Sequence, residues 1–264
     1  MTSHELELTT ANRLRLARAF RHNPRVDYAI DCVLEAQMGQ AFVDDLDRPT
    51  AYRITIGPFW YFAGDADGPG GRALLAEWPA YNLLMPSPPA WAAAAGELFG
   101  ARLVAFPRYS FSADGLNAAH LTSIIEASPQ RDRVVAVDAA LLARAADGLE
   151  TYVDLADFDS PDDFVARGLG FVALDGERVM GAAYSSLVCN RGIEVSLYVD
   201  EPYRRQGVAT AIAGRLLLEC VRQGRRPNWD AANLESCALA EKLGYVATGS
   251  YDCTFYRPEQ PTAG

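Results

Sequence analysis

Two different hydrophobic periods follow each other in the second half of the chain. Residues 192–199 alternate with a period of two, which is typical of a strand. Residues 207–223 repeat apolar positions at spacings of three and one, which predicts a helix with one apolar face. The members of that face are Ala209, Ile212, Ala213, Leu216, Leu217, Cys220 and Val221.

Further elements surround this strand and helix. Before them, residues 171–188 predict a hairpin that turns at Asp175-Gly176. After them come a short strand at 228–230, a helix over 234–243 and the last strands over 245–256. The order of three strands, a helix, a strand, a helix and a strand predicts an α/β fold.

The first half of the chain alternates helical and extended patterns. We expect a helix over 10–20, a hairpin of 51–56 with 59–63, and a strand over 102–111 that is followed by a helix to residue 127. No internal repeat or low-complexity tract interrupts these elements.

A domain boundary is predicted at Ser128-Pro129-Gln130, where turn-forming residues follow a helix. It divides the chain into an N-terminal α/β region, residues 1–128, and a second domain, residues 129–264. A boundary as late as residue 150 also fits the pattern.

Composition and charge narrow the class of protein. The chain has 264 residues, 50% of them hydrophobic, and lacks an apolar run of the roughly 18 to 20 residues that a membrane helix needs. Its start has no basic flank or apolar segment, so we expect no signal peptide and a cytoplasmic protein. A formal net charge of −10 disfavours nucleic acid and anionic membranes as partners.

Cysteine and histidine side chains are dispersed rather than clustered. The five cysteines form no C-x-x-C pair, and the three histidines do not gather near them. We therefore expect buried structural thiols, no disulfide framework and no metal site. The residues are Cys32, Cys189, Cys220, Cys237 and Cys253, with His4, His22 and His120.

A short Arg/Gly turn joins the strand that ends at Val199 to the helix that follows. It has the pattern Arg204-x-x-Gly207-x-Ala209. Glycine lets the backbone approach a ligand closely, and the unpaired first N–H groups and the dipole of a helix favour anions. This arrangement predicts a site for a pyrophosphate.

Positive charge surrounds this turn within an acidic protein. Residues 203–226 contain six arginines against Glu219 alone. A solvated helix face is the usual explanation of such a run, but its place around a phosphate-type turn favours a role in anion binding. The arginines are Arg204, Arg205, Arg215, Arg222, Arg225 and Arg226.

The turn and a second motif resemble the GNAT acetyltransferase superfamily. The second motif runs from Asn233 to Gly244-Tyr245 and is similar to the family's Asn-x-x-Ala…Lys-x-Gly-Phe segment. The resemblance implies a GNAT fold with a mixed, mostly antiparallel central sheet that is splayed between its fourth and fifth strands, beside the N-terminal α/β half.

One branch, the zwittermicin A resistance type of GNAT protein, is the most similar. The resemblance rests on Glu194, Tyr203-Arg204-x-x-Gly207-x-Ala209-Thr210, Cys220, Pro227-x-Trp229-Asp230-Ala231-x-Asn233-x-x-Ser236 and Leu239-Ala240-Glu241-Lys242-Leu243-Gly244. Weaker upstream matches are Gly39-x-x-Phe42-Val43-Asp44-Asp45, Phe62-Ala63-Gly64-Asp65 and Arg108-Tyr109-x-Phe111. The resemblance therefore spans nearly the whole chain.

The resemblance implies that acetyl-CoA is the co-substrate and lies in the opening between the fourth and fifth strands. The backbone of Leu197, Tyr198 and Val199 would pair with the pantetheine arm, and an N–H near Tyr198 or Val199 would polarise the thioester carbonyl. Asn233 and Ser236 are further candidate contacts. The amides of Arg205, Gln206, Gly207, Val208, Ala209 and Thr210 would hold the pyrophosphate, with Arg204 and Arg205 adding charge.

The candidate general base is Glu194, a carboxylate in an otherwise apolar strand. A period of two puts it on one face with Ser196 and Tyr198, unless a bulge changes that parity. An outward, solvated position is the alternative. Transfer to an amine requires such a base, because an ammonium must lose a proton before it can attack.

The general acid is harder to assign from the sequence. The family often has Tyr seven residues after the motif Asn, where this chain has Ala240. Ser236 or Tyr245 could replace it, or the thiolate could leave unaided. Tyr245 also fits a core position, and Asn233 a helix cap.

The predicted function is transfer of an acetyl group from acetyl-CoA to a primary amine of a small molecule. The resemblance suggests an aminopolyol antibiotic and hence antibiotic resistance, while a metabolite amine or a peptide N-terminus stays open. The N-terminal half would shape the acceptor site or form a homodimer contact. A non-catalytic acyl-CoA sensor or scaffold is the alternative. Another nucleotide-binding fold is disfavoured, because neither a Walker A sequence nor G-x-G-x-x-G occurs.

Overall fold

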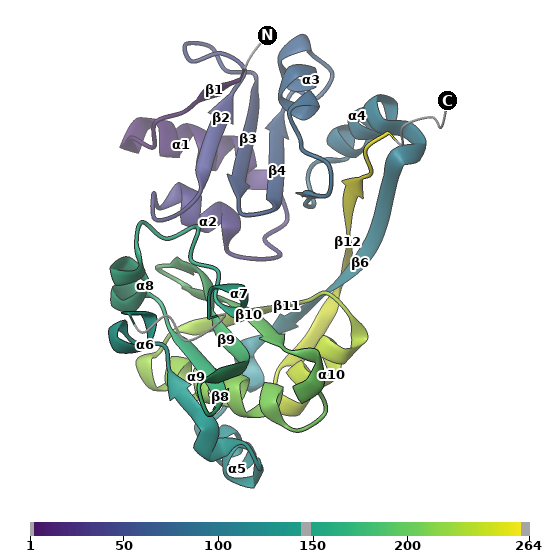
Figure 1. Ribbon diagram of the computed structural model, residues 1–264. Coiled ribbons are helices and arrows are strands. Elements are labelled where there is room, and N and C mark those ends of the chain that lie inside the picture. Colours follow the sequence, from purple (N-terminus) through teal and green to yellow (C-terminus); the bar gives the residue numbers. More distant parts are fainter. Residues whose placement is uncertain (1–2, 144–148, 260–264) are drawn as a thin grey trace. The chain divides into compact units, whose positions relative to one another are not determined.

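The computed structural model describes residues 3–143 and 149–259 and divides into two compact units. One unit comprises residues 1–108 with 250–264, and the other comprises residues 109–249. Strands β6 (Leu103–Ser112) and β12 (Val246–Tyr256) contribute residues to both units. Figure 1 labels the elements along the chain.

The first unit contains a sheet with strand order β1-β2-β3-β4-β5, antiparallel except for the β4–β5 pair. The predicted hairpin is present as β3 and β4, which pair from Ala51–Gly64 to Ile56–Phe59. Its core holds Trp91 stacked on Phe62, with ring centroids 4.8 Å apart. The elements are β1 (His4–Glu5), α1 (Thr10–Ala19), α2 (Ala29–Leu34), β2 (Gln40–Val43), β3 (Ala51–Ile56), β4 (Phe59–Gly64), α3 (Pro69–Ala76), β5 (Leu83–Leu84) and α4 (Pro89–Phe99).

The second unit contains the strand order β6-β11-β10-β9-β8-β7, in which the β10–β11 pair is parallel and the others are antiparallel. Its elements are α5 (Ala118–Ala127), β7 (Val134–Ala136), α6 (Ala139–Ala143), α7 (Leu149–Tyr152), α8 (Pro161–Arg167), β8 (Gly170–Asp175), β9 (Arg178–Cys189), β10 (Gly192–Val199), α9 (Val208–Gln223), β11 (Arg226–Ala231) and α10 (Leu234–Leu243). Short 3-10 helices lie at Phe20–His22, Gly100–Arg102, Ala113–Gly115, Arg131–Arg133 and Glu201–Tyr203.

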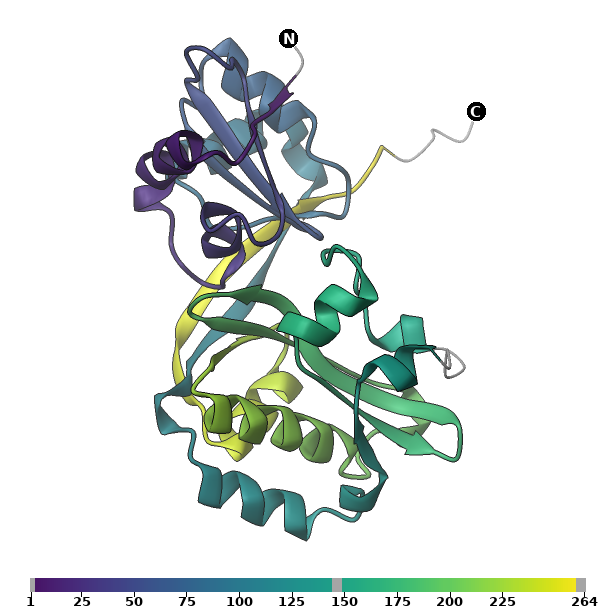
Figure 2. The same cartoon turned by 90° about the vertical axis from the view of Figure 1, so that its left-hand side faces the viewer.

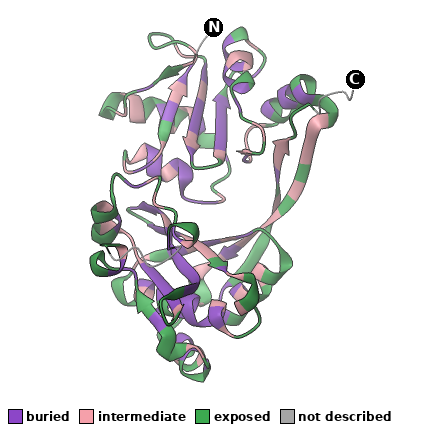
Figure 3. Cartoon of the chain, viewed as in Figure 1, coloured by how far each residue is buried: buried purple, intermediate pink, exposed green. Residues whose placement is uncertain are grey.

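Helix α9 is covered on two sides, which explains why it is buried beyond its predicted apolar face. Its side chains pack on β8 and β9, while α5 lies along it (Figure 2). A Cβ at Gly214 would lie 2.9 Å from Cγ1 of Ile125, so glycine allows α5 to approach closely. Buried residues continue along β8 and β9, whereas α5 is mostly exposed (Figure 3).

Strands β10 and β11 pair over three residues and then separate. Gly192, Ile193 and Glu194 pair with Arg226, Pro227 and Asn228, whereas β10 continues to pair with β9 as far as Val199. The sheet is therefore splayed between the fourth and fifth strands of the predicted fold. The predicted mixed, mostly antiparallel GNAT sheet is confirmed.

The two compact units divide the chain at other residues than the predicted boundary. Helix α5 packs on α9 and so belongs to the second unit, together with the segment 128–130 at which we predicted the boundary. The division into domains at residue 128 stays a prediction.

Replacing Gly192 by alanine should destabilise the second unit. The added Cβ would lie 1.8 Å from the Arg226 carbonyl oxygen, so β10 and β11 would have to move apart. We expect Gly192→Ala to lower the free energy of unfolding by about 1 to 3 kcal/mol, as overpacking does. Urea unfolding followed by circular dichroism measures this loss.

The control is Gly96→Ala, whose added Cβ meets nothing within 4 Å on helix α4. It should be neutral or stabilise by up to about 1 kcal/mol. Equal stability of the Gly192→Ala and wild-type proteins would contradict the close approach of the two strands.

Candidate functional site

The turn between β10 and α9 exposes the first N–H groups of the helix without a side-chain cap. Gly207 is the N-cap residue, with φ 86° and ψ 2°, and no side chain caps the helix there. Arg205 also has a left-handed φ of 61°. A Cβ at Gly207 would come no closer than 3.4 Å to a neighbour, so the conformation rather than crowding calls for glycine.

The segment 128–130, where the domain boundary was predicted, contacts this turn. The side-chain amide of Gln130 donates from Nε2 to the Gln206 carbonyl oxygen at 3.2 Å, and the Ser128 hydroxyl donates to the Gly207 carbonyl oxygen at 3.4 Å. Sequence reasoning missed this contact, because a turn-forming tripeptide carries no sign of a partner 76 residues away.

Two arginines of the basic run flank the turn. Arg204 and Arg205 are exposed, and Arg204 donates from Nε to the Val199 carbonyl oxygen at 3.1 Å. This bond ties the side chain to the end of β10. Together with the helix dipole, the two guanidinium groups make the turn electropositive, so it fits a phosphate group.

The other arginines lie elsewhere, which corrects the expectation that the whole run serves anion binding. Helix α9 has 16 residues and is about 24 Å long, so its far end is remote from the turn. There, Arg225 donates to the Arg167 carbonyl oxygen at 2.5 Å and Arg226 pairs with Asp114 at 2.8 Å. Arg222 lies 3.8 Å from Glu219, and Arg215 lies over the Phe171 ring.

The only lysine of the chain reaches the first turn of α9. Lys242, in the last turn of α10, donates from Nζ to the Thr210 hydroxyl oxygen at 3.2 Å. An ammonium beside a helix N-terminus is unfavourable unless an anion is bound there. This contact therefore adds to the anion-binding character of the turn.

Glu194 lies at the last paired position before the strands separate. Its side chain is buried, with 7% of the residue exposed, and Asn228 of β11 donates from Nδ2 to both carboxylate oxygens at 3.0 Å. The alternative of an outward, solvated glutamate is therefore wrong. Asn228 was missed in the sequence, where it stood out only as part of a short strand.

A bulge occurs beside Glu194, but it leaves the parity of β10 intact. The register shifts between Glu194 and Val195, and the unpaired extra residue is Ser186 of β9. Ser196 then pairs with Tyr184, and Tyr198 packs on Tyr152 with ring centroids 5.5 Å apart.

The open edge of β10 carries the residues predicted to pair with pantetheine. Leu197 and Tyr198 have strand partners in β9, and the described part of β11 pairs with β10 no farther than Glu194. Tyr198 is 45% exposed, whereas Val199 is buried and its carbonyl accepts from Arg204.

The second motif is arranged around the start of α10. Asn233 caps the helix through Oδ1, which accepts from the Ser236 N–H at 2.9 Å, so the predicted cap is present. The Ser236 hydroxyl oxygen accepts from Trp229 Nε1 at 3.1 Å. Ser236 thus lies in the first turn of α10, beside β11.

Two positions considered for the general acid are in the core. Tyr245 is 4% exposed and donates its hydroxyl to the Pro227 carbonyl oxygen at 3.3 Å, which agrees with its core interpretation. Ala240 is fully buried. A tyrosine at position 240 would therefore need a different packing of α10.

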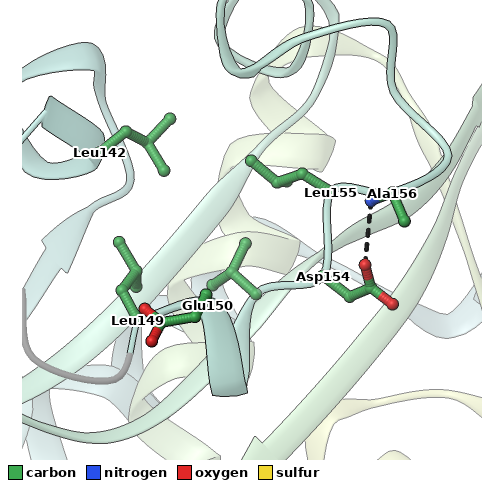
Figure 4. A pocket seen from close by; sticks show the side chains of 7 residues that line it. Leu142, Leu149, Glu150, Asp154, Leu155 and Ala156 are labelled. Carbon is green, nitrogen blue, oxygen red and sulfur yellow. Dashed lines mark hydrogen bonds between the residues drawn. The ribbon is translucent and has the colours of Figure 1, made fainter. Parts of the chain in front are cut away.

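A pocket of about 350 Å³ lies between α6, α7 and the loop after α7 (Figure 4). The Asp154 carboxylate in it accepts from the Ala156 N–H at 2.9 Å. None of the predicted site residues lines it. Its lining residues are Leu142, Leu149, Glu150, Val153, Asp154, Leu155 and Ala156.

Other sequence expectations concern metals, membranes and thiols. Within residues 3–143 and 149–259, no group of three or more His, Cys, Asp or Glu could hold a metal ion. The helices in these ranges include none long and apolar enough to cross a membrane. The five cysteines, all within the described ranges, form no disulfide with one another, and burial raises the pKa of Cys220 to about 12.

Known proteins are similar to this chain in sequence and in fold. The model of the family "GNAT acetyltransferase" matches residues 20–254. A GCN5-related N-acetyltransferase-like protein from Streptococcus suis 89/1591 has 30% identity and a TM-score of 0.81, over 94% of this chain and 100% of that chain. A GCN5-related N-acetyltransferase from Sphaerobacter thermophilus has 16% identity and a TM-score of 0.55, over 97% and 96% of the two chains, and shares the fold.

One curated relative is similar over a shorter stretch. The uncharacterized N-acetyltransferase YdfB of Bacillus subtilis (strain 168) is 33% identical over 96 residues, which are 36% of this chain. The match spans 37% of that relative. Since the family model covers most of the sequence, the chain belongs to the GNAT acetyltransferase family, a family of acetyltransferase enzymes.

Proposed function

We propose that this chain transfers an acetyl group from acetyl-CoA to a primary amine of a small molecule. The observation that supports it is the arrangement along β10. A buried carboxylate, Glu194, lies where β10 and β11 separate, and an electropositive helix N-terminus at Gly207 follows the other end of the same strand. Between them runs a strand edge without a β11 partner in the described residues.

Two neighbouring segments, the edge of β10 and the turn before α9, would bind different parts of the donor. When bound, acetyl-CoA supplies an acetyl group on an activated thioester. The backbone of Leu197, Tyr198 and Val199 would pair with its extended arm as an added strand. The amides from Arg205 to Thr210 would hold the pyrophosphate, with charge from Arg204, Arg205 and Lys242 nearby.

Glu194 would accept the proton that the acceptor amine loses, directly or through water. The Asn228 amide donates to both carboxylate oxygens, which fixes the carboxylate plane. The contact therefore suits a base.

Proton delivery to the departing thiolate would fall to Ser236 or to no side chain. The Ser236 oxygen accepts from Trp229, so its own proton can be donated elsewhere. Tyr245 is unsuited, since its hydroxyl proton is donated to Pro227. A thiol has a pKa of about 8.5, so unaided departure is feasible near neutral pH.

We propose further that the chain is of the zwittermicin A resistance type and that its acceptor is an aminopolyol-type amine. The support is the sequence match that runs from Glu194 to Gly244. The Bacillus subtilis relative is named an N-acetyltransferase, which agrees with an amine acceptor. An antibiotic resistance role would follow from such an acceptor.

Thiol release from acetyl-CoA across a panel of amines tests the function. We expect turnover with one class of primary amines among aminopolyols, aminoglycosides, polyamines and peptides. Calorimetric CoA binding runs alongside as the control for an intact donor site. Tight CoA binding without turnover by any amine would favour the acyl-CoA sensor instead.

Gly207→Asp should abolish CoA binding. It puts a negative charge at the turn and a side chain in a left-handed conformation. The matched control is Gly224→Asp at the other end of α9, where φ is 67° and an added Cβ meets nothing within 4 Å. Calorimetry should show CoA affinity lost in the first variant and kept in the second. Equal affinity in both variants would place the pyrophosphate elsewhere.

Glu194→Gln should lower kcat about 100-fold or more, as loss of a general base does, and leave CoA affinity unchanged. The amide keeps the size of the side chain but cannot accept the proton. Glu219→Gln, on the exposed end of α9, is the control and should keep full activity. Steady-state kinetics with the best amine measures both, and full activity of Glu194→Gln would exclude it as the base.

A further inference from the structure

One peptide group of the anion-binding turn is oriented from outside the turn. The first backbone bond of α9 runs from the Ala211 N–H to the Gly207 carbonyl oxygen at 3.1 Å. That bond fixes the peptide between Gly207 and Val208. The preceding peptide, between Gln206 and Gly207, lies outside the helix, and its carbonyl accepts from the side chain of Gln130.

Holding that carbonyl also sets the direction of an N–H group. In a planar trans peptide the C=O and N–H point in opposite directions. The bond from Gln130 to the Gln206 carbonyl therefore directs the Gly207 N–H away from the 128–130 segment. Glycine adopts positive and negative φ with similar ease, so without this bond the peptide before Gly207 could rotate at little cost.

The 128–130 segment is itself held firmly enough to serve this purpose. The Ser128 N–H donates to the Ile125 carbonyl oxygen at 3.0 Å, and the Gln130 N–H donates to the Ser128 hydroxyl oxygen at 3.2 Å. Ile125 packs against Gly214 in the middle of α9. Helix α5, the segment and the turn thus form one braced unit.

We propose that Gln130 is a positioning residue for the pyrophosphate of acyl-CoA. It acts through the Gln206–Gly207 peptide, which it orients so that the Gly207 N–H points to the phosphate side. The proposal rests on the proposed function, because it assigns the turn to the donor. It implies that Gln130 matters only for donors that carry the pyrophosphate.

The test compares two donors, acetyl-CoA and S-acetylpantetheine, which lacks the pyrophosphate. Gln130→Met keeps the length of the side chain but removes the donor. It should raise the KM for acetyl-CoA about 3- to 10-fold, the usual worth of one hydrogen bond, with kcat unchanged. The kcat/KM for S-acetylpantetheine should stay at the wild-type value.

A second variant separates the hydrogen bond from packing. Gln130→Glu keeps the shape but sets a carboxylate against the Gln206 carbonyl, so its KM for acetyl-CoA should rise more than that of Gln130→Met. Gln223→Met is the matched control. Gln223 lies at the far end of α9, where its Nε2 donates to Glu219 Oε1 at 2.8 Å, so the change should affect neither donor's kinetics.

Two outcomes would overturn the proposal. An equal loss with both donors would mean that Gln130 supports the fold generally, and no loss with either would mean that it does not orient the turn. If the wild-type protein acetylates no amine, calorimetric CoA affinity decides instead. A 3- to 10-fold weaker affinity of Gln130→Met than of Gln223→Met supports the proposal, and equal affinities refute it, whatever becomes of the proposed function.

Discussion

The site depends on how few residues join β10 to β11. Three parallel pairs, ending at Glu194 and Asn228, hold the strands together, and beyond them β10 pairs with β9 and β11 with β6 within the described residues. Gly192 permits this short contact, because a side chain there would collide with the Arg226 carbonyl. A strand edge left without a partner is a template for another extended chain. The opening and the edge that we propose for donor binding are therefore one consequence of where the pairing stops.

Glu194 and Val199 mark the two ends of this edge of β10. The five residue steps between them span about 17 Å at roughly 3.3 Å per residue. The proposed donor, acyl-CoA, has an extended arm between its acyl group and its pyrophosphate, so its shape suits a strand edge of this length.

The sequence predicted those features that depend on local pattern. The strand and helix periods, the turn at Gly207 and the cap at Asn233 were expected, because each follows from neighbouring residues. The splayed sheet was expected only from the family resemblance. The contacts of Gln130, Asn228 and Lys242 were not, since they join residues 76, 34 and 32 positions apart. The number of arginines in the basic run also did not predict where they lie, because helix α9 separates those that follow it from those at the turn.

The proposed reaction has two proton transfers, one from the acceptor amine and one to the departing thiolate. The placement of buried polar groups agrees with the transfer that costs more free energy. The pKa of a primary amine, near 10.4, lies about 3.4 units above pH 7, so removal of its proton at neutral pH costs about 4.6 kcal/mol. The pKa of a thiol, about 8.5, lies only about 1.5 units above pH 7, so its departure as a thiolate costs about 2 kcal/mol. In the proposed reaction the buried, hydrogen-bonded carboxylate of Glu194 would serve the costlier transfer, whereas position 240 is a core alanine. The smaller cost of thiolate departure makes a dedicated acid less necessary than a base.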